Sequence, residues 1–131
     1  MKEFSRHWIS SKQPRKQRKY RYNAPLHILR KLMSAHLSKE LKKKYNIRSM
    51  PLRKGDKVKI ARGQFKKKTG KVEKVWTKRR KIQIENIHLI KKDGSKIPYL
   101  IEPSNVIITE LVLEDKKRKQ IIERRSKGEK K

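Results

Sequence analysis

The stretch 57-KVKIARGQFKKKTGKVEKVW-76 decides the fold of this chain. Its first six residues alternate polar and apolar side chains, which is typical of a strand with one buried face, and its last six form a second such run. The turn between them lies within residues 63–70, where glycines at both ends permit a tight reversal. Lys66, Lys67 and Lys68 exceed what a turn requires. They form either an ordinary solvated turn or a tip that contacts a partner.

The same period of two continues through residues 51–113. We expect these apolar side chains to point inward: Val58, Ile60, Val72, Ile82, Ile84, Val106 and Ile108. Turn-like breaks occur at 77-TKRR-80, 93-DG-94 and 103-PSN-105. The apolar positions step by three from Val72 to Val75 and from Ile84 to Ile87, and each slip predicts a bulge that increases sheet twist. About five short strands in this range predict a small SH3-like barrel.

Residues 24–50 form a helical lead-in to this barrel. Asn23 and Pro25 suit the start of a helix, whose apolar face comprises Leu26, Leu29 and Met33. A second apolar run comprises Leu37, Leu41 and Tyr45, with Ser34 or Ser38 as its cap and Asn46 as a left-handed end. We predict two short helices, or one helix broken near Ser34, with the apolar stripe packed on the barrel.

Basic segments flank these two regions. Residues 1–23 show no helical or strand period and are interpreted as an arm that follows a phosphate backbone, or as a disordered tail. Trp8, Tyr20 or Tyr22 would stack on an unpaired base. Residues 114–131 surround two isoleucines with charge, which fits a short helix formed on binding or a frayed tail.

The net charge of +29 favours a polyanionic partner. The charge is +13 over residues 1–50, +11 over residues 51–113 and +5 over residues 114–131. A membrane-surface peptide or a localisation signal would concentrate charge in one segment, and so would a cleaved transit peptide. A basic balance in every segment instead indicates a chain that lies along nucleic acid. No apolar run approaches the length of a membrane span, which is about 20 residues.

The sequence contains no pattern that indicates catalysis or a metal site. Cysteine is absent, and the four histidines share no ligand spacing. The segment from Gly63 to Lys71 differs from a P-loop, because six residues separate its glycines and Val72 follows the lysine. The acids Asp56, Glu73, Glu85 and Glu102 lie among lysines, where salt bridges are expected. We therefore expect neither an enzyme nor a bound cofactor.

The stretch 54-KGDKVKIARGQFKKKTGKVEKVW-76 resembles a KOW motif, with Gly70 at the glycine position. Two flanking stretches, 24-APLHILRKLMSAHLSKELKKKYNIRSMPLRKGD-56 and 103-PSNVIITEL-111, resemble large-subunit ribosomal proteins of the L-twenty-four family, in its archaeal and eukaryotic cytosolic branch. The resemblance covers roughly residues 4–125. It implies a mainly β fold, in which short α-helices precede an SH3-like (KOW) barrel with basic N- and C-terminal extensions.

The resemblance also implies a function. Family members bind large-subunit ribosomal RNA in its 5′ region, act early in subunit assembly and lie near the mouth of the polypeptide exit tunnel. The expected partners are this RNA, neighbouring large-subunit proteins and factors that dock at the exit tunnel, without a homo-oligomer. The expected location is the cytoplasmic ribosome.

We predict that basic, aromatic, glycine and turn residues contact RNA. Arginine suits bidentate phosphate contacts, and glycine lets a backbone approach RNA closely. The predicted RNA-binding residues are Trp8, Arg15, Lys16, Arg18, Lys19, Tyr20, Arg21, Arg30, Lys31, Arg48, Arg53, Lys54, Arg62, Gly63, Gln64, Lys66, Lys67, Lys68, Gly70, Lys71, Arg79, Arg80, Ser104 and Asn105.

Two other functions fit parts of the pattern. KOW domains also occur in transcription elongation factors that bind RNA polymerase or nucleic acid, but these usually carry a further α/β domain before the KOW unit, for which 131 residues leave no room. A histone-like DNA-compacting protein is the other alternative.

Overall fold

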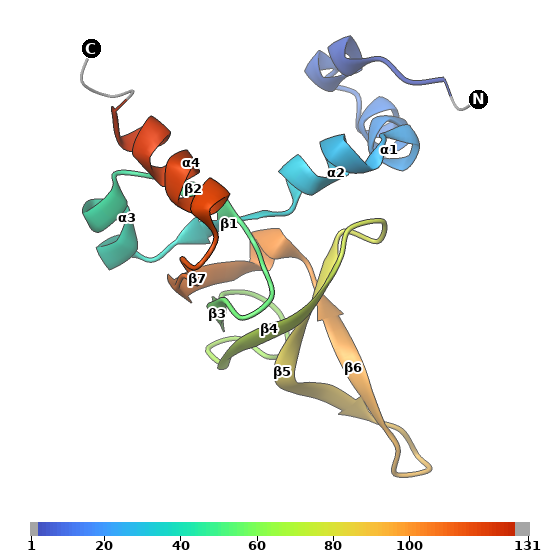
Figure 1. Cartoon of the computed structure of the whole chain (residues 1–131). Coiled ribbons are helices and arrows are strands. Elements are labelled where there is room, and N and C mark those ends of the chain that lie inside the picture. The colour runs from blue at the N-terminus through green and yellow to red at the C-terminus, as the bar shows by residue number, and fades with distance from the viewer. Residues whose placement is uncertain (1–2, 128–131) are drawn as a thin grey trace.

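Across residues 3–127, which this computed structural model describes, seven strands form one sheet in the order β2-β1-β7-β3-β4-β5-β6 (Figure 1). The strands are β1 (Ser34–Leu37), β2 (Ser49–Pro51), β3 (Lys57–Ile60), β4 (Thr69–Trp76), β5 (Lys81–Ile90), β6 (Lys96–Ile101) and β7 (Val106–Glu110). The helices are α1 (Pro14–Asn23), α2 (Leu26–Leu32), α3 (Lys39–Tyr45) and α4 (Lys116–Lys127), with 3-10 turns η1 (Arg6–Ser10) and η2 (Pro103–Asn105).

Strands β3 to β7 form the predicted small barrel-like unit. The seven side chains expected to point inward are each 1% exposed or less, and they form one core. The alternation in the sequence therefore predicted the buried face of these strands correctly. A register error of one residue would have turned every one of these side chains outward.

Both predicted bulges are present. The pairing of β4 with β5 shifts between Val72 and Lys74, and the pairing of β5 with β6 shifts between Gln83 and His88. Asn86 lies inside the second irregularity with a φ of 61°, a left-handed conformation that asparagine tolerates better than most residues. The bulges bend β5, and beyond the second bulge the β5–β6 hairpin projects from the body of the molecule (Figure 1).

The lead-in differs from its prediction at two points. Asn23 is the last residue of α1 and does not cap the next helix, since Pro25 stands before α2 without a side-chain cap. Two short helices are present, and Ser38 caps α3 by accepting a hydrogen bond from the Leu41 N–H, while Asn46 ends it at a φ of 53°. Leu37, however, lies in strand β1 and not in the second helix. Strand β1 pairs in parallel with β7, and the Ser38 N–H donates to the Ile108 carbonyl at 2.8 Å. This pairing with a distant strand prevails over the local helical spacing.

Residues 1–23 contain helical structure where the sequence predicted none. Helix α1 and turn η1 build a second, smaller core with α2, in which Tyr20, Ala24, Ile28 and Leu29 are buried. The apolar stripe of α2 is consequently divided. Leu29 packs in this second core, Met33 joins the barrel core, and Leu26 stays 53% exposed.

Helix α4 is fixed to the barrel by a buried ion pair. The Arg118 guanidinium donates from Nη1 and Nη2 to the two carboxylate oxygens of Asp56, each at 2.7 Å, and both side chains are at least 98% buried. At the start of the helix, Asp115 accepts from the Lys117 N–H at 2.8 Å and pairs with Arg53. These contacts, that with Lys117 first, hold the pKa of the Asp115 carboxyl below its usual value of 3.8. Up to residue 127 the C-terminal segment is thus a helix docked on the barrel without a partner, whereas its sequence suggested either a helix formed on binding or a frayed tail.

Candidate nucleic-acid interface

The loop between β3 and β4 presents three lysines to solvent. The Lys67 N–H donates to the Ile60 carbonyl and the Ile60 N–H donates to the Lys68 carbonyl, each at 2.9 Å, so the loop is closed at its base. Phe65 points inward, where it is buried against Tyr99 with ring centroids 5.1 Å apart. Lys66, Lys67 and Lys68 are all exposed. The loop is therefore anchored by one aromatic side chain. Lys68 Nζ lies 5.1 Å from the centroid of the Phe65 ring, and all three lysines stay exposed to a ligand.

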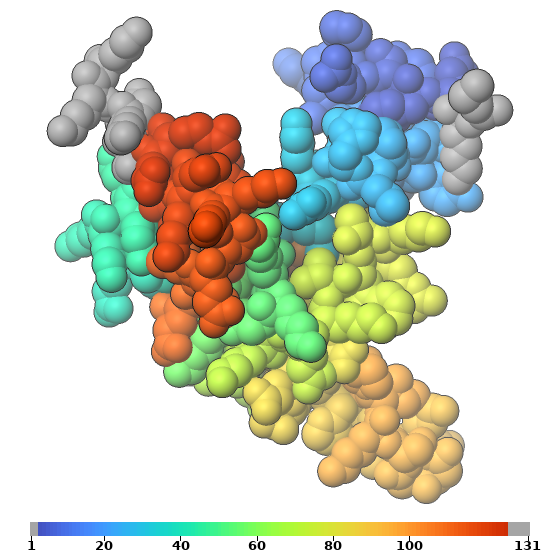
Figure 2. All heavy atoms as spheres, viewed as in Figure 1, coloured from blue at the N-terminus to red at the C-terminus, as the bar shows by residue number. Residues whose placement is uncertain are grey.

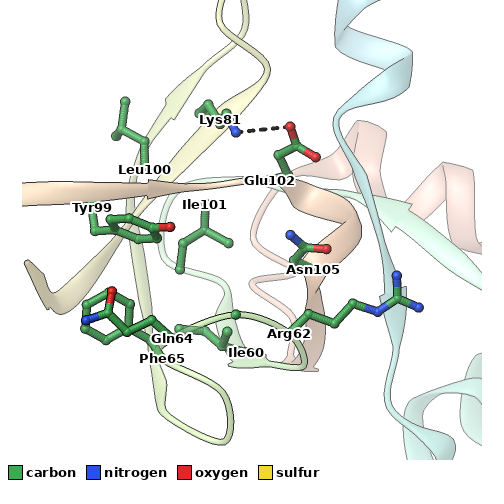
Figure 3. Close-up of a pocket in the computed structure, with 11 residues that line it drawn as sticks. Ile60, Arg62, Gln64, Phe65, Lys81, Tyr99, Leu100, Ile101, Glu102 and Asn105 are labelled. Carbon is green, nitrogen blue, oxygen red and sulfur yellow. Dashed lines mark hydrogen bonds and ion pairs between the residues drawn. The ribbon is translucent and has the colours of Figure 1, made fainter. Parts of the chain in front are cut away.

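A small pocket of about 100 Å³ lies beside this loop (Figure 3). The predicted contact residues Arg62, Gly63, Gln64 and Asn105 line it, because the Ala61 N–H donates to the Asn105 carbonyl at 2.8 Å. Figure 3 shows Arg62 and Asn105 at one end of the pocket and Gln64 at the other. The fold thus brings together polar groups that lie far apart in the sequence. Gly63 has a φ of 95°, and the space where a side chain would stand is open.

A larger basic groove separates α1 and α2 from the turn between β4 and β5, and we call it the N-terminal groove. Its volume is about 790 Å³. Figures 1 and 2 show the β4–β5 turn reaching toward the N-terminal helices. The groove is lined by Arg15, Arg18, Lys19, Arg21, Tyr22, Ala24, Leu26, Leu29, Lys78 and Arg80. It unites five predicted residues from two distant segments with Lys78, which our prediction omitted although it belongs to the run 77-TKRR-80.

Four further predicted residues, Arg30, Lys31, Arg53 and Lys54, line a second groove of about 870 Å³ between α2, β4 and α4. Figure 2 shows the notch between α4 and α2. Lys74 also lines this groove, and its Nζ lies 4.2 Å from the centroid of the Trp76 ring. Arg79 lies over the same ring at 5.6 Å. Predicted residues that are exposed outside these two grooves and the pocket are Lys16, Arg48, Lys66, Lys67, Lys68, Lys71, Arg79 and Ser104.

Three predicted contacts need correction or reassignment. Tyr20 is only 3% exposed and packs on Phe4 with ring centroids 5.0 Å apart, so it supports α1 and cannot stack on a base. Trp8 is half-buried against the same core, with Lys19 Nζ at 5.9 Å from its ring. Gly70 faces the neighbouring strand, where an added Cβ would lie 2.7 Å from Ile84 Cγ2. Of the three aromatic candidates, Tyr22 is the exposed one at 76%.

The arrangement is suited to binding anions. Within residues 3–127, no group of three or more histidines or acids lies close enough to hold a metal ion. In that same part of the chain, no helix is long and apolar enough to cross a membrane. Lysine and arginine side chains dominate the N-terminal groove and the exposed part of the β3–β4 loop. The second groove is mixed, because apolar side chains and Glu73 line it together with six cationic residues. The strand-to-strand setting of that loop also confirms that residues 63–71 do not form a P-loop.

Comparison of the sequence with known proteins identifies its family. Residues 11–125 match the model of a family described as the eukaryotic ribosomal proteins L26 and their archaeal L24 counterparts. The chain is 50% identical over 117 residues to the large ribosomal subunit protein uL24 of Korarchaeum cryptofilum (strain OPF8), a match that spans 89% of each chain. It is 49% identical over 115 residues to the protein of the same name from Methanosphaera stadtmanae, covering 88% of this chain and 98% of that protein. The chain therefore belongs to the family of large-subunit ribosomal proteins that comprises eukaryotic L26 and archaeal L24.

Proposed function

We propose that this chain is a structural constituent of the large ribosomal subunit that works by binding large-subunit ribosomal RNA, without catalysis. The observation that carries the proposal is the N-terminal groove, whose lining contains six cationic side chains and no carboxylate. Clefts lined by one sign of charge focus the electrostatic potential and attract a polyanion.

The mechanism follows from charge and shape. Lysine and arginine neutralise phosphates that otherwise repel one another when RNA helices pack together. Side chains cannot read the deep major groove of A-form RNA, so recognition rests on backbone shape and 2′-hydroxyls. The pocket residues Gln64 and Asn105 supply neutral donors of the kind that 2′-hydroxyls accept.

The proposal extends to early assembly and to a position near the mouth of the exit tunnel. Family membership supports this extension, together with the resemblance of the lead-in and of the last strand to those of the archaeal and eukaryotic cytosolic branch. Neighbouring ribosomal proteins and factors docking at the tunnel are then the protein partners. We further propose that the chain binds as a single copy.

Competition between nucleic acids tests the RNA proposal. The dissociation constant is measured for a fragment from the 5′ region of large-subunit RNA and for duplex DNA of equal length, at matched salt. We expect tighter binding to the RNA at every salt concentration, with log K falling by roughly 0.7–0.9 per log unit of salt for each phosphate neutralised. Equal affinity for both would contradict the proposal.

Sedimentation provides an independent test in the assembled particle. We expect the protein to travel with the large subunit at low salt and to leave it at high salt, because phosphate contacts weaken as salt rises. A protein that never sediments with the subunit would overturn the ribosomal part of the proposal.

A further inference from the structure

The N-terminal groove has walls from two segments that lie far apart in the sequence. Helix α1 supplies Arg15, Arg18, Lys19 and Arg21, and the β4–β5 turn supplies Lys78 and Arg80. Within residues 3–127, no ion pair joins any of these six side chains to an acid. Their charge is therefore left for a ligand that enters between the two walls.

The wall formed by α1 is fixed from behind. Tyr20 and Ala24 are buried with Ile28 of α2, and the Gln17 side-chain amide donates to the Ile9 carbonyl at 2.8 Å and to the Ser11 carbonyl at 2.6 Å. These contacts fix the backbone of α1, so the positions from which its cationic side chains extend are set before a ligand arrives.

The wall formed by the β4–β5 turn is also fixed. Arg80 has a φ of 52°, and its N–H donates to the Thr77 carbonyl at 3.1 Å, which closes the turn. Left-handed backbone at a non-glycine residue costs roughly 1–2 kcal/mol and persists where the surrounding structure enforces it. The neighbouring Trp76 ring packs with Lys74 and Arg79, which anchors the base of the turn. Two rigid cationic walls lower the ordering cost of binding.

The floor and rim of the groove indicate the kind of ligand. Ala24, Leu26 and Leu29 line it with apolar surface, and Tyr22, at its rim, is a residue that is 76% exposed. Proteins that bind single-stranded nucleic acid combine a cationic groove for the backbone with aromatic rings on which bases stack. The groove is open and has a volume of about 790 Å³, which accommodates a short stretch of one strand. The exposed aromatic side chain at its rim is the feature that favours a single strand over a duplex, because bases in a duplex are already stacked.

We infer that the N-terminal groove clamps a single-stranded segment of RNA, with phosphates held between α1 and the β4–β5 turn and a base stacked on Tyr22. This inference rests on the proposed RNA-binding function and adds the place and the strandedness of one contact. An acidic peptide would satisfy the cations but has no base to stack on the exposed ring, so RNA is the favoured ligand.

The test compares two pairs of substitutions in the full chain. The groove pair, Arg18→Ala with Lys78→Ala, removes one cation from each wall. The control pair, Lys91→Ala with Lys92→Ala, removes the same charge from exposed positions at the far end of the β5–β6 hairpin (Figure 1). The probe is a short single-stranded oligoribonucleotide, measured by fluorescence anisotropy across a salt series. Thermal unfolding monitored by circular dichroism verifies that each variant is folded.

We expect the groove pair to lower the salt slope by about 1.4, which is twice the ~0.7 of each single-strand phosphate contact, and the control pair to leave the slope unchanged. We expect Tyr22→Ala to weaken binding roughly 5- to 150-fold, as the loss of one stacked base does, and Tyr22→Phe to retain affinity. The groove pair should affect the single strand more than a duplex RNA of the same length.

Each opposing result has a defined meaning. If the groove pair and the control pair lower the salt slope equally, the effect comes from the net charge of the protein and not from a specific site, and the clamp is overturned. Competition by polyglutamate as effective as that by single-stranded RNA of equal charge would assign the groove to an acidic peptide. If the wild-type chain still prefers the ribosomal RNA fragment to duplex DNA in either case, the clamp fails and the proposed function stands. If the wild-type chain shows no such preference, the proposed function fails, whatever the groove variants do.

Discussion

The β3–β4 loop separates residues that shape it from residues that face outward. Phe65 and Gly63 determine its path, the former by burial against Tyr99 and the latter by a φ of 95°. Lys67 also has a positive φ, of 75°, which lysine adopts only at a cost of roughly 1–2 kcal/mol. We predict that phosphate contact, which a glycine could not provide, accounts for a lysine at this exposed and conformationally costly position.

Replacing Lys66, Lys67 and Lys68 together with alanine tests that role. We expect the salt slope of RNA binding to fall by about 2 to 3, since each phosphate contact contributes roughly 0.7–0.9. The melting temperature should change little, because all three side chains are exposed. Alanine at Lys91, Lys92 and Lys96 removes the same charge and is the matched control. A collapse of the melting temperature would instead make the loop cations structural.

Gly70→Ala should have the opposite effect. The new Cβ would lie 2.7 Å from Ile84 Cγ2 and 2.9 Å from the Glu85 carbonyl oxygen, and backbone atoms cannot move aside cheaply. We expect a loss of about 1–3 kcal/mol in the free energy of unfolding, measured by urea denaturation, with RNA affinity of the folded fraction retained. Lys71→Ala, at the next and exposed position, should cost less than about 0.5 kcal/mol. Equal stability of both variants would show that β4 and β5 can separate to admit a side chain.

At the scale of elements, local patterns predicted the strands better than the docking of helices. The steps of three from Val72 and Ile84 indicated both bulges, because a bulge shifts the inward face within a single strand. The docking of α4 could not be predicted in this way. Arg118 lies in a run of four cations that look alike in the sequence, and its partner Asp56 precedes it by 62 residues. The partner was recognised as a salt-bridging residue, but nothing local identifies which cation reaches it.

Arg118→Met should detach α4 from the barrel. Asp56 would remain buried without the guanidinium that pairs with it. Removing one partner of a buried ion pair typically costs about 3–5 kcal/mol. Arg118 also donates to the carbonyls of Val112 and Pro51, so these acceptors would lose their partner as well. We expect a large decrease in stability to urea and faster proteolysis within residues 114–127 than in the wild type.

Lys119→Met is the control for this substitution, because it changes the adjacent and exposed cation in the same helix. We expect it to alter stability by less than about 0.5 kcal/mol. Asp56→Asn combined with Arg118→Met should cost less than the sum of the two single changes, since both remove the same interaction. Additive costs, or a mild effect of Arg118→Met alone, would argue against the ion pair as the attachment of α4.

At the scale of the whole molecule, two hydrophobic cores lie within residues 3–127, beneath a surface with an excess of positive charge. The barrel core followed from alternation in the sequence, but the core around Tyr20 and Leu29 did not. Its apolar residues are spread thinly among cations in α1, with Phe4 and Trp8 added from outside the helix, so no periodic stripe reveals it. The same lack of pattern concealed the N-terminal groove, which exists only because α1 folds against α2 and faces the β4–β5 turn.

The net charge of +29 predicts that salt has opposite effects on the free protein and on its complex. Like charges repel within the folded chain, and the Debye length shortens from about 30 Å at 0.01 M salt to about 3 Å at 1 M. We expect the melting temperature of the free protein to rise by several degrees between about 0.01 M and 0.5 M sodium chloride, measured by calorimetry.

Over the same range RNA affinity should fall steeply, because bound counterions are no longer released into dilute solution. The melting temperature with bound RNA should therefore exceed that of the free protein by a margin that narrows as salt rises. A free protein whose melting temperature falls with salt would mean that favourable ion pairs, such as those of Lys57 with Glu110 and Lys81 with Glu102, outweigh the repulsion.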